Sequence, residues 1–120
     1  MKSILIVDDS RTSRKILRGI LENSGYEIVA EATNGKEGYD KYVEFKPDVV
    51  TMDITMPVLD GIEALKKIVG DFPDAKVIMV TAAGQKTKLV EAVQNGASEF
   101  VSKPFDPEQL REIIEKVTAE

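Results

Sequence analysis

The sequence predicts an α/β protein, a doubly wound parallel sheet of five strands that alternate with five helices. Short runs rich in β-branched residues recur along the chain, and segments with helical periodicity separate them. Some of these runs are almost continuously apolar, which is typical of strands covered by helices on both faces. Five strands in such a sheet commonly take the order 2-1-3-4-5, which reverses direction between the first and third strands.

Five runs are expected to form the strands of this sheet. In chain order they cover residues 4–7, 27–31, 48–53, 76–81 and 98–103. The first, third and fourth runs are the most apolar, so we expect helices to cover both faces of these three strands.

The helices are indicated by apolar residues at helical spacing and by start and stop signals. The clearest is the last, whose apolar residues fall at i, i+3, i+4 and i+7: Leu110, Ile113, Ile114 and Val117. Asp106 is suited to cap this helix and Pro107 to be its first residue. The first helix is expected to stop near Gly25. The next three should end before these breakers: Pro47, Pro73 and the pair Asn95-Gly96.

Length and composition favour one small domain and exclude several kinds of chemistry. The 120 residues, 42% of them hydrophobic, fit a single domain that covers residues 1–120. Without cysteine or histidine, the chain has no thiolate nucleophile, no imidazole base and no Cys-based metal site. Any chemistry therefore rests on carboxylates, hydroxyls, lysine and backbone groups, and carboxylates favour hard cations such as Mg²⁺.

The same features set expectations for where the chain acts. No apolar run approaches the ~20 residues that span a bilayer, and no signal-peptide pattern follows Met1, so we expect a cytoplasmic protein without membrane contact. The net charge of -5 argues against nonspecific binding to nucleic acid. We expect a monomer whose partners are proteins.

Polar residues of complementary chemistry stand at the carboxyl ends of four predicted strands. Asp8 and Asp9 follow the first strand, and Asp53 ends the third. Thr81 and Lys103 end the fourth and fifth. Ligands of doubly wound sheets bind at this edge, beside the reversal of strand order. The three carboxylates are therefore expected to converge there, where their mutual repulsion requires a nearby cation.

This group of side chains suits phosphoryl transfer. Mg²⁺ takes a few carboxylate oxygens, keeps several waters and can hold the oxygens of an incoming phosphoryl group. The Thr81 hydroxyl and the Lys103 ammonium would orient and neutralise that group. Asp53 is the candidate nucleophile because carboxylates form aspartyl phosphates, and a histidine in the donor would belong to a partner.

Each of these residues has a simpler explanation when it is taken alone. Asp9 or Ser10 would be an ordinary helix cap, and Asp53 a solvated strand end. Thr81 suits a strand by propensity, and an isolated Lys103 would usually face solvent. Four strand ends that turn polar in matching chemistry favour a shared site over these separate explanations. The first helix also carries basic side chains that are expected to form a solvated face: Arg11, Arg14, Lys15 and Arg18.

Four segments together resemble the receiver domain of bacterial two-component response regulators, over essentially the whole chain. They are LIVDDS with the acidic pair, PDVVTMDITMPVLDG around the aspartate of the third strand, VIMVTAAG with the hydroxyl, and FVSKPF with the lysine and proline. Any one segment alone would be weak evidence, whereas the four together are specific. The resemblance implies a flavodoxin-like (βα)5 fold.

The resemblance also implies a role for each residue at the acidic site. Asp53 would accept a phosphoryl group from the phosphohistidine of a sensor histidine kinase. Asp8 and Asp9 would join Asp53 in holding Mg²⁺, with Asp8 acting through a water. The backbone carbonyl of Thr55 would be a further metal ligand.

Other residues would carry the switch that the resemblance implies. Thr81 would bind the phosphoryl oxygen and move, and Lys103 would pair with the same group. Phe100 would rotate into the vacated space, without the hydroxyl that a tyrosine would bring. The surface of the fourth helix, fifth strand and fifth helix would then change for a target protein. Ala83 would neighbour the phosphoryl group, and the dephosphorylation rate of Ala83→Glu would show whether that position governs the attacking water.

Within the family, the segments AEATNGKEG and MDITMPVLDG are most similar to chemotaxis regulators that bind the flagellar motor switch. Since the fifth helix is followed closely by Glu120, no attached output domain is expected. The expected partners are a chemotaxis histidine kinase, the flagellar motor switch protein or another target protein, and a phosphatase. The chain is not expected to be an enzyme for other substrates, since it would catalyse only its own phosphorylation and dephosphorylation at Asp53.

Three alternatives stay open from the sequence. The chain could be a stand-alone phosphorelay receiver outside chemotaxis. It could be a small Mg²⁺-dependent phosphohydrolase, which would turn over small phosphate esters. It could also be a receiver used only for docking, in which case it would not be phosphorylated.

Overall fold

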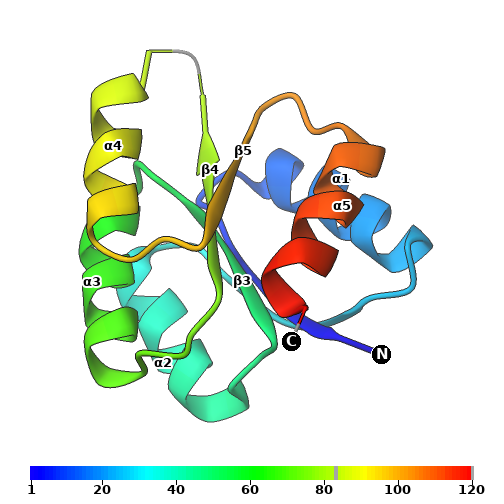
Figure 1. Ribbon diagram of the computed structural model, residues 1–120, viewed down its shortest axis with the longest axis horizontal. Coiled ribbons are helices and arrows are strands. Elements are labelled where there is room, and N and C mark those ends of the chain that lie inside the picture. The colour runs from blue at the N-terminus through cyan, green and yellow to red at the C-terminus, as the bar shows by residue number, and fades with distance from the viewer. Residues whose placement is uncertain (83, 120) are drawn as a thin grey trace.

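A five-stranded parallel sheet lies between two layers of helices in the computed structural model, which describes residues 1–82 and 84–119 (Figure 1). The strands are β1 (Ser3–Val7), β2 (Glu27–Ala32), β3 (Val49–Asp53), β4 (Val77–Thr81) and β5 (Glu99–Ser102). They are all paired in parallel, in the order β2-β1-β3-β4-β5. The predicted fold class and strand order are therefore confirmed, and no strand boundary differs from its prediction by more than one residue.

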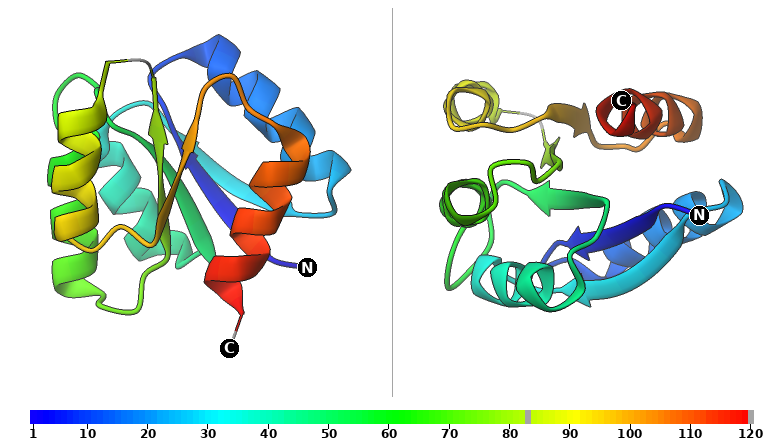
Figure 2. Two further views of the ribbon diagram at one scale, coloured as in Figure 1. Left: turned by 45° about the horizontal axis from the view of Figure 1, so that its top comes forward. Right: turned by 60° about the horizontal axis from the view of Figure 1, so that its bottom comes forward.

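Five helices alternate with the strands and cover both faces of the sheet (Figure 2). They are α1 (Arg11–Asn23), α2 (Gly35–Phe45), α3 (Gly61–Asp71), α4 (Lys86–Gln94) and α5 (Pro107–Thr118). The helices α1 and α5 lie on one face, and α2, α3 and α4 lie on the other. Among the described residues, none of these helices has the length and apolar character needed to cross a membrane.

A side chain caps the start of four of the five helices. Ser10 caps α1 by accepting a hydrogen bond from the Ser13 N–H, and Asp106 caps α5 with Pro107 as its first residue. Asn34 and Asp60 cap α2 and α3 in the same way. The exception is α4, whose N-cap residue makes no side-chain capping hydrogen bond. The start of α4 must therefore be held by other contacts.

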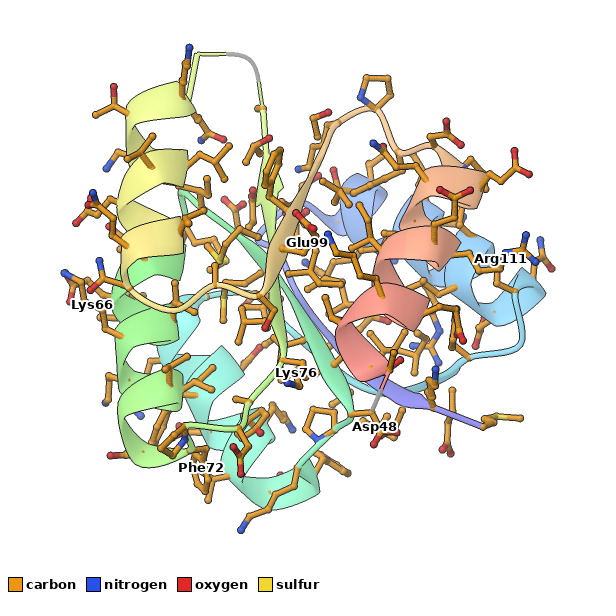
Figure 3. All side chains as sticks on the ribbon, in the orientation of Figure 1. Asp48, Lys66, Phe72, Lys76, Glu99 and Arg111 are labelled. Atoms are coloured by element: carbon orange, nitrogen blue, oxygen red, sulfur yellow. The ribbon has the colours of Figure 1, made fainter. Side chains whose placement is uncertain are left out.

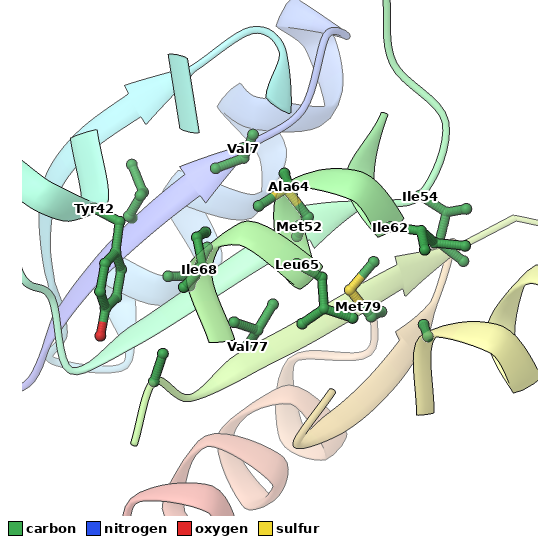
Figure 4. Close-up of a cluster of buried hydrophobic side chains, with 14 of the residues drawn as sticks. Val7, Tyr42, Met52, Ile54, Ile62, Ala64, Leu65, Ile68, Val77 and Met79 are labelled. Carbon is green, nitrogen blue, oxygen red and sulfur yellow. The ribbon is translucent and has the colours of Figure 1, made fainter. Parts of the chain in front are cut away.

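Apolar side chains fill both spaces between the sheet and its helical layers. Figure 4 shows the larger cluster, in which Leu65 and Ile68 of α3 pack with Met52, Val77 and other side chains of the sheet. A second cluster joins Leu17 of α1 to other side chains of β1, β4, β5 and α5 on the opposite face. Because β1, β3 and β4 are buried on both faces, their carboxyl ends are held rigidly at one edge of the sheet.

Charged side chains cover the outside of the helical layers and add little to the stability of the fold (Figure 3). Lys66 on the outer side of α3 lies 3.7 Å from a carboxylate oxygen of Glu91 on α4. Lys116 of α5 lies 2.8 Å from Glu99 of β5. Exposed pairs of this kind contribute at most about 1 kcal/mol each, so the apolar clusters hold the layers together.

The first residue of α3 packs directly against the end of β3. A Cβ atom on Gly61 would lie 1.9 Å from the backbone oxygen of Asp53, which is far inside van der Waals contact. The Gly61 N–H donates to the carbonyl of Ile54 at 2.7 Å. This close approach fixes the backbone that carries Asp53, and only glycine permits it.

The Gly61→Ala variant should lose at least about 2 kcal/mol of unfolding free energy, because the new methyl group must displace backbone rather than a flexible side chain. Gly70→Ala in the same helix is the matched control, since nothing lies within 4 Å of a Cβ there. That control should be stabilised by roughly 0.5 to 1 kcal/mol through helix propensity. Urea denaturation measures both, and a Gly61→Ala protein as stable as wild type would contradict the close packing.

Candidate functional site

Three carboxylates meet at the point where the strand order reverses. Asp8 follows β1 and Asp53 ends β3, and these two strands are neighbours in the sheet. One carboxylate oxygen from each of Asp8, Asp9 and Asp53 can be chosen so that all three lie within 4.8 Å of one another. The predicted convergence of the acidic residues is therefore confirmed.

Asp8 is held by several contacts of its backbone and side chain. Its N–H donates to the carbonyl of Ala32, and its Oδ1 accepts from the Ser10 N–H at 2.8 Å. The Arg14 guanidinium donates through Nη1 to the carbonyl of Asp8 at 2.8 Å and through Nε to Glu31 at 3.0 Å. These bonds fix the turn from β1 into α1, and with it the direction of the Asp8 carboxylate.

Arg14 is the first site residue that reasoning from the sequence missed. It was expected on a solvated basic face, but its side chain is only 15% exposed. A usable signal exists, since Arg14 lies in the first turn of α1 and side chains on helices lean toward the N-terminus. Its reach therefore includes the strand end that precedes the helix.

Lys103 supplies the positive charge at the site. Its Nζ lies 3.1 Å from Asp8 Oδ2 and 3.9 Å from Asp53 Oδ2, and its side chain is 25% exposed. The Lys103 N–H donates to the carbonyl of Thr81, which continues the pairing of β4 and β5 past the end of β5. The following peptide bond, Lys103–Pro104, is cis. The explanation of Lys103 as an ordinary solvent-facing lysine is wrong.

Asp53 lies in an unfavourable environment for a negative charge. It is 8% exposed, and its Oδ1 accepts one hydrogen bond from the Ile54 N–H at 3.1 Å. Burial, and then the nearby Asp8 charge, raise the pKa of Asp53 to about 6 against the opposing effect of Lys103. One ammonium group thus leaves part of the repulsion among three carboxylates uncompensated.

The donor set fits a hard divalent cation. The three acids offer only carboxylate oxygens, with two of the side chains buried and Asp9 exposed at the mouth of the site. Oxygen ligands of this kind, with room for water on the exposed side, suit Mg²⁺. Asp8, Asp9 and Asp53 would hold the ion, and the carbonyl of Thr55 as a further ligand stays a prediction.

The switch residues take positions that the sequence could not specify. Thr81 is buried, and its hydroxyl donates to the carbonyl of Val101 on β5 at 3.3 Å. Phe100 is 42% exposed on β5. Ala83, the other residue expected beside the phosphoryl group, lies outside the described residues. Sequence reasoning also passed over Gln85, whose side chain bonds to Thr55.

The raised pKa of Asp53 predicts that its ionisation destabilises the metal-free protein. A carboxyl with a higher pKa in the folded state stabilises that state while protonated, so the contribution is complete below about pH 4 and is lost as pH rises through about 6. Asp53→Asn cannot ionise. Without divalent metal at pH 7.5 it should be more stable than wild type by roughly 1 to 3 kcal/mol.

Urea denaturation in the presence of a chelator measures this difference, which should shrink at pH 4.5. Asp40→Asn is the control, because Asp40 is an exposed partner of Lys36 and its loss should change stability by less than about 1 kcal/mol. Equal stability of Asp53→Asn and wild type at pH 7.5 would show that the site carries no electrostatic strain.

Comparisons with known proteins agree with this geometry. The family model described as "Response regulator receiver domain" matches residues 4–115. The chain is 48% identical over 117 residues to a chemotaxis protein CheY of Thermotoga maritima, covering 98% of both chains. It is also 48% identical over 113 residues to the CheY of Bacillus subtilis, covering 94% of both.

A similar solved structure is the CheX–CheY–BeF3–Mg²⁺ complex from Borrelia burgdorferi. Its matched chain is 35% identical to this one with a TM-score of 0.93, over 99% of this chain and 90% of that chain. The response regulator domain of Thermotoga maritima CheB is also similar, with 38% identity and a TM-score of 0.86. The chain therefore belongs to the response regulator receiver domain family, and it is similar over almost its whole length to chemotaxis proteins CheY.

Proposed function

We propose that this protein is a phospho-accepting chemotaxis response regulator that takes a phosphoryl group from a sensor histidine kinase onto Asp53. The observation that carries the proposal is the convergence of Asp8, Asp9 and Lys103 around Asp53 at one edge of the sheet. We propose the cytoplasm, the compartment that the sequence favours, as the place of transfer. We propose that the protein catalyses only its own phosphorylation and dephosphorylation at Asp53.

In the transfer step an Asp53 carboxylate oxygen forms a bond to phosphorus. The bond from phosphorus to the kinase imidazole nitrogen breaks, and its electron pair returns to that nitrogen. Asp53 must be ionised to act as the nucleophile, and with a pKa of about 6 roughly a tenth of it is protonated at pH 7. Bound Mg²⁺ would neutralise the charge that develops on the phosphoryl oxygens. Lys103 Nζ lies 3.9 Å from Asp53 Oδ2, so it can pair with one of these oxygens.

The phosphorylated site requires the surrounding residues to rearrange. A phosphoryl group adds roughly -1.5 to -2 charges and three strong acceptor oxygens next to two existing carboxylates. The Thr81 hydroxyl can serve one oxygen only after it leaves the carbonyl of Val101. That movement would open space beneath the partly exposed Phe100 on β5.

The surface formed by α4, β5 and α5 is the proposed output face. Besides Phe100, it carries the exposed apolar side chains of Val90 and Val93 on α4. Exposed apolar groups next to a mobile switch suit a protein partner that distinguishes two states. From the similarity to CheY proteins, the flagellar motor switch protein is the first candidate, and a phosphorelay target outside chemotaxis is the second.

Two further partners follow from the same similarity. A chemotaxis histidine kinase would supply the phosphoryl group. The Borrelia burgdorferi relative forms a complex with CheX in the presence of BeF3 and Mg²⁺, which supports a CheX-like partner for the phosphorylated form of this chain. We propose that a phosphatase also acts on Asp53.

Incubation with acetyl phosphate and Mg²⁺ should add one phosphoryl group to the wild-type protein, measured as a mass gain, and none to Asp53→Asn. The reason is that Asp53 is the proposed acceptor, with its Oδ2 3.9 Å from Lys103 Nζ inside the acidic cluster, and an asparagine amide cannot take its place as the nucleophile. No gain on wild type, or an equal gain on Asp53→Asn, would overturn the proposed function. Sustained turnover of small phosphate esters would favour a phosphohydrolase instead.

Lys103→Ala should still gain the phosphoryl group but fail to bind a partner that requires phosphorylation. Its ammonium links the phosphorylation site to the end of β5, so its loss should uncouple acceptance from the output face. A pull-down with the flagellar motor switch protein, with and without acetyl phosphate, measures this. Lys88 is an exposed lysine on α4. The Lys88→Ala control therefore shows whether the loss of any positive charge from the proposed output face abolishes binding in the same way. Phosphorylation-dependent binding by Lys103→Ala at the wild-type level would refute the role of Lys103.

A further inference from the structure

The side chain of Gln85 joins the two loops that flank Asp53. Its Nε2 donates to the hydroxyl of Thr55 at 3.0 Å, and its Oε1 accepts from the backbone N–H of Ala82 at 2.7 Å. Thr55 is two residues beyond Asp53 in the loop after β3, and Ala82 directly follows the switch residue Thr81 at the end of β4. One amide group therefore spans the two sides of the site.

Gln85 is also the N-cap residue of α4, and it makes no side-chain hydrogen bond to its own helix. The N-cap side chains of the other four helices each accept from an N–H in their own first turn. At α4 the Gln85 amide group instead forms hydrogen bonds with Thr55 and Ala82. The start of α4, which belongs to the proposed output face, is thereby tied to the backbone beside the phosphorylation site.

The Ala82 N–H lies where a phosphoryl group on Asp53 needs donors. Asp53 is paired with Val80 in the sheet, and the Ile54 N–H donates to the Val80 carbonyl at 3.3 Å. Thr81 and Ala82 are therefore the next two residues along the strand beside Asp53. In this structure both of their donors are occupied, the Thr81 hydroxyl by a carbonyl of β5 and the Ala82 N–H by Gln85.

We propose that the Gln85 latch, meaning the Gln85 amide with the Ala82 N–H and the Thr55 hydroxyl, holds Thr81 and Ala82 in their unphosphorylated conformation. The inference rests on the proposed function, because the competitor is the phosphoryl group on Asp53. That group draws the Ala82 N–H away from Gln85, since a charged acceptor forms a stronger hydrogen bond than a neutral amide oxygen. Opening the latch releases the start of α4 together with Thr81.

The latch therefore lowers the apparent affinity of the site for a phosphoryl group. Two neutral hydrogen bonds that exist only in the closed state favour that state by roughly five- to thirtyfold in population. Removal of both bonds should strengthen binding of a phosphoryl mimic by the same factor.

Gln85→Met tests the latch, because methionine keeps the length of the side chain and its helix propensity but loses the amide. Lys86→Ala is the matched control, an exposed neighbour that makes no contact with the latch among the described hydrogen bonds. The first readout is amide hydrogen exchange at Ala82 in the unphosphorylated protein, which should become faster in Gln85→Met only. The second is the dissociation constant of beryllofluoride at fixed Mg²⁺, which should fall roughly five- to thirtyfold in Gln85→Met and stay unchanged in the control.

The outcomes separate the latch from the function on which it rests. If wild type neither gains mass from acetyl phosphate nor binds beryllofluoride, the proposed function fails and the latch fails with it. If wild type does both, but Gln85→Met binds beryllofluoride with wild-type affinity, the latch alone is overturned. Weaker binding by Gln85→Met would also overturn it, because Gln85 would then support the phosphorylated state.

Discussion

The repulsion among Asp8, Asp9 and Asp53 is the constraint on which the rest of the structure depends. Carboxylates separate when they are free to do so, yet here one oxygen of each lies within 4.8 Å of the others. The sheet enforces this, because β1 and β3 are adjacent, parallel and buried on both faces. The core therefore holds in place a charge arrangement that is unfavourable in the absence of a cation.

The contacts around the site either hold the three acids together against their repulsion or offset part of their charge. The close approach of Gly61 to the backbone of Asp53, and the hydrogen bond from Arg14 to the Asp8 carbonyl, prevent the acids from moving apart. Lys103 offsets only part of the charge, since the pKa of Asp53 stays raised. A divalent cation and a phosphoryl group each change this balance. In our proposal, the Gln85 latch sets how easily Thr81 and Ala82 respond to that change.

The sequence was sufficient for the fold and for most of the site. Apolar runs and breakers located every strand, and residue type at strand ends identified Asp8, Asp53 and Lys103, because parallel strands bring their carboxyl ends to one edge. The sequence was insufficient where a long side chain can reach several hydrogen-bond partners and only the three-dimensional structure shows which one it contacts. Arg14 could bond to solvent or to Asp8, and Gln85 could cap its helix or bridge two loops. Those choices depend on loop conformations that no local pattern specifies.

The most direct test of the enforced repulsion is isothermal titration of Mg²⁺ into the protein, in two buffers of different ionisation enthalpy. At pH 6 we expect binding to release about half a proton, because Asp53 with a pKa of about 6 must ionise to hold the ion. At pH 8 the release should be close to zero and the binding tighter. Binding that releases no proton at pH 6, with equal affinity at both pH values, would contradict a strained acidic site.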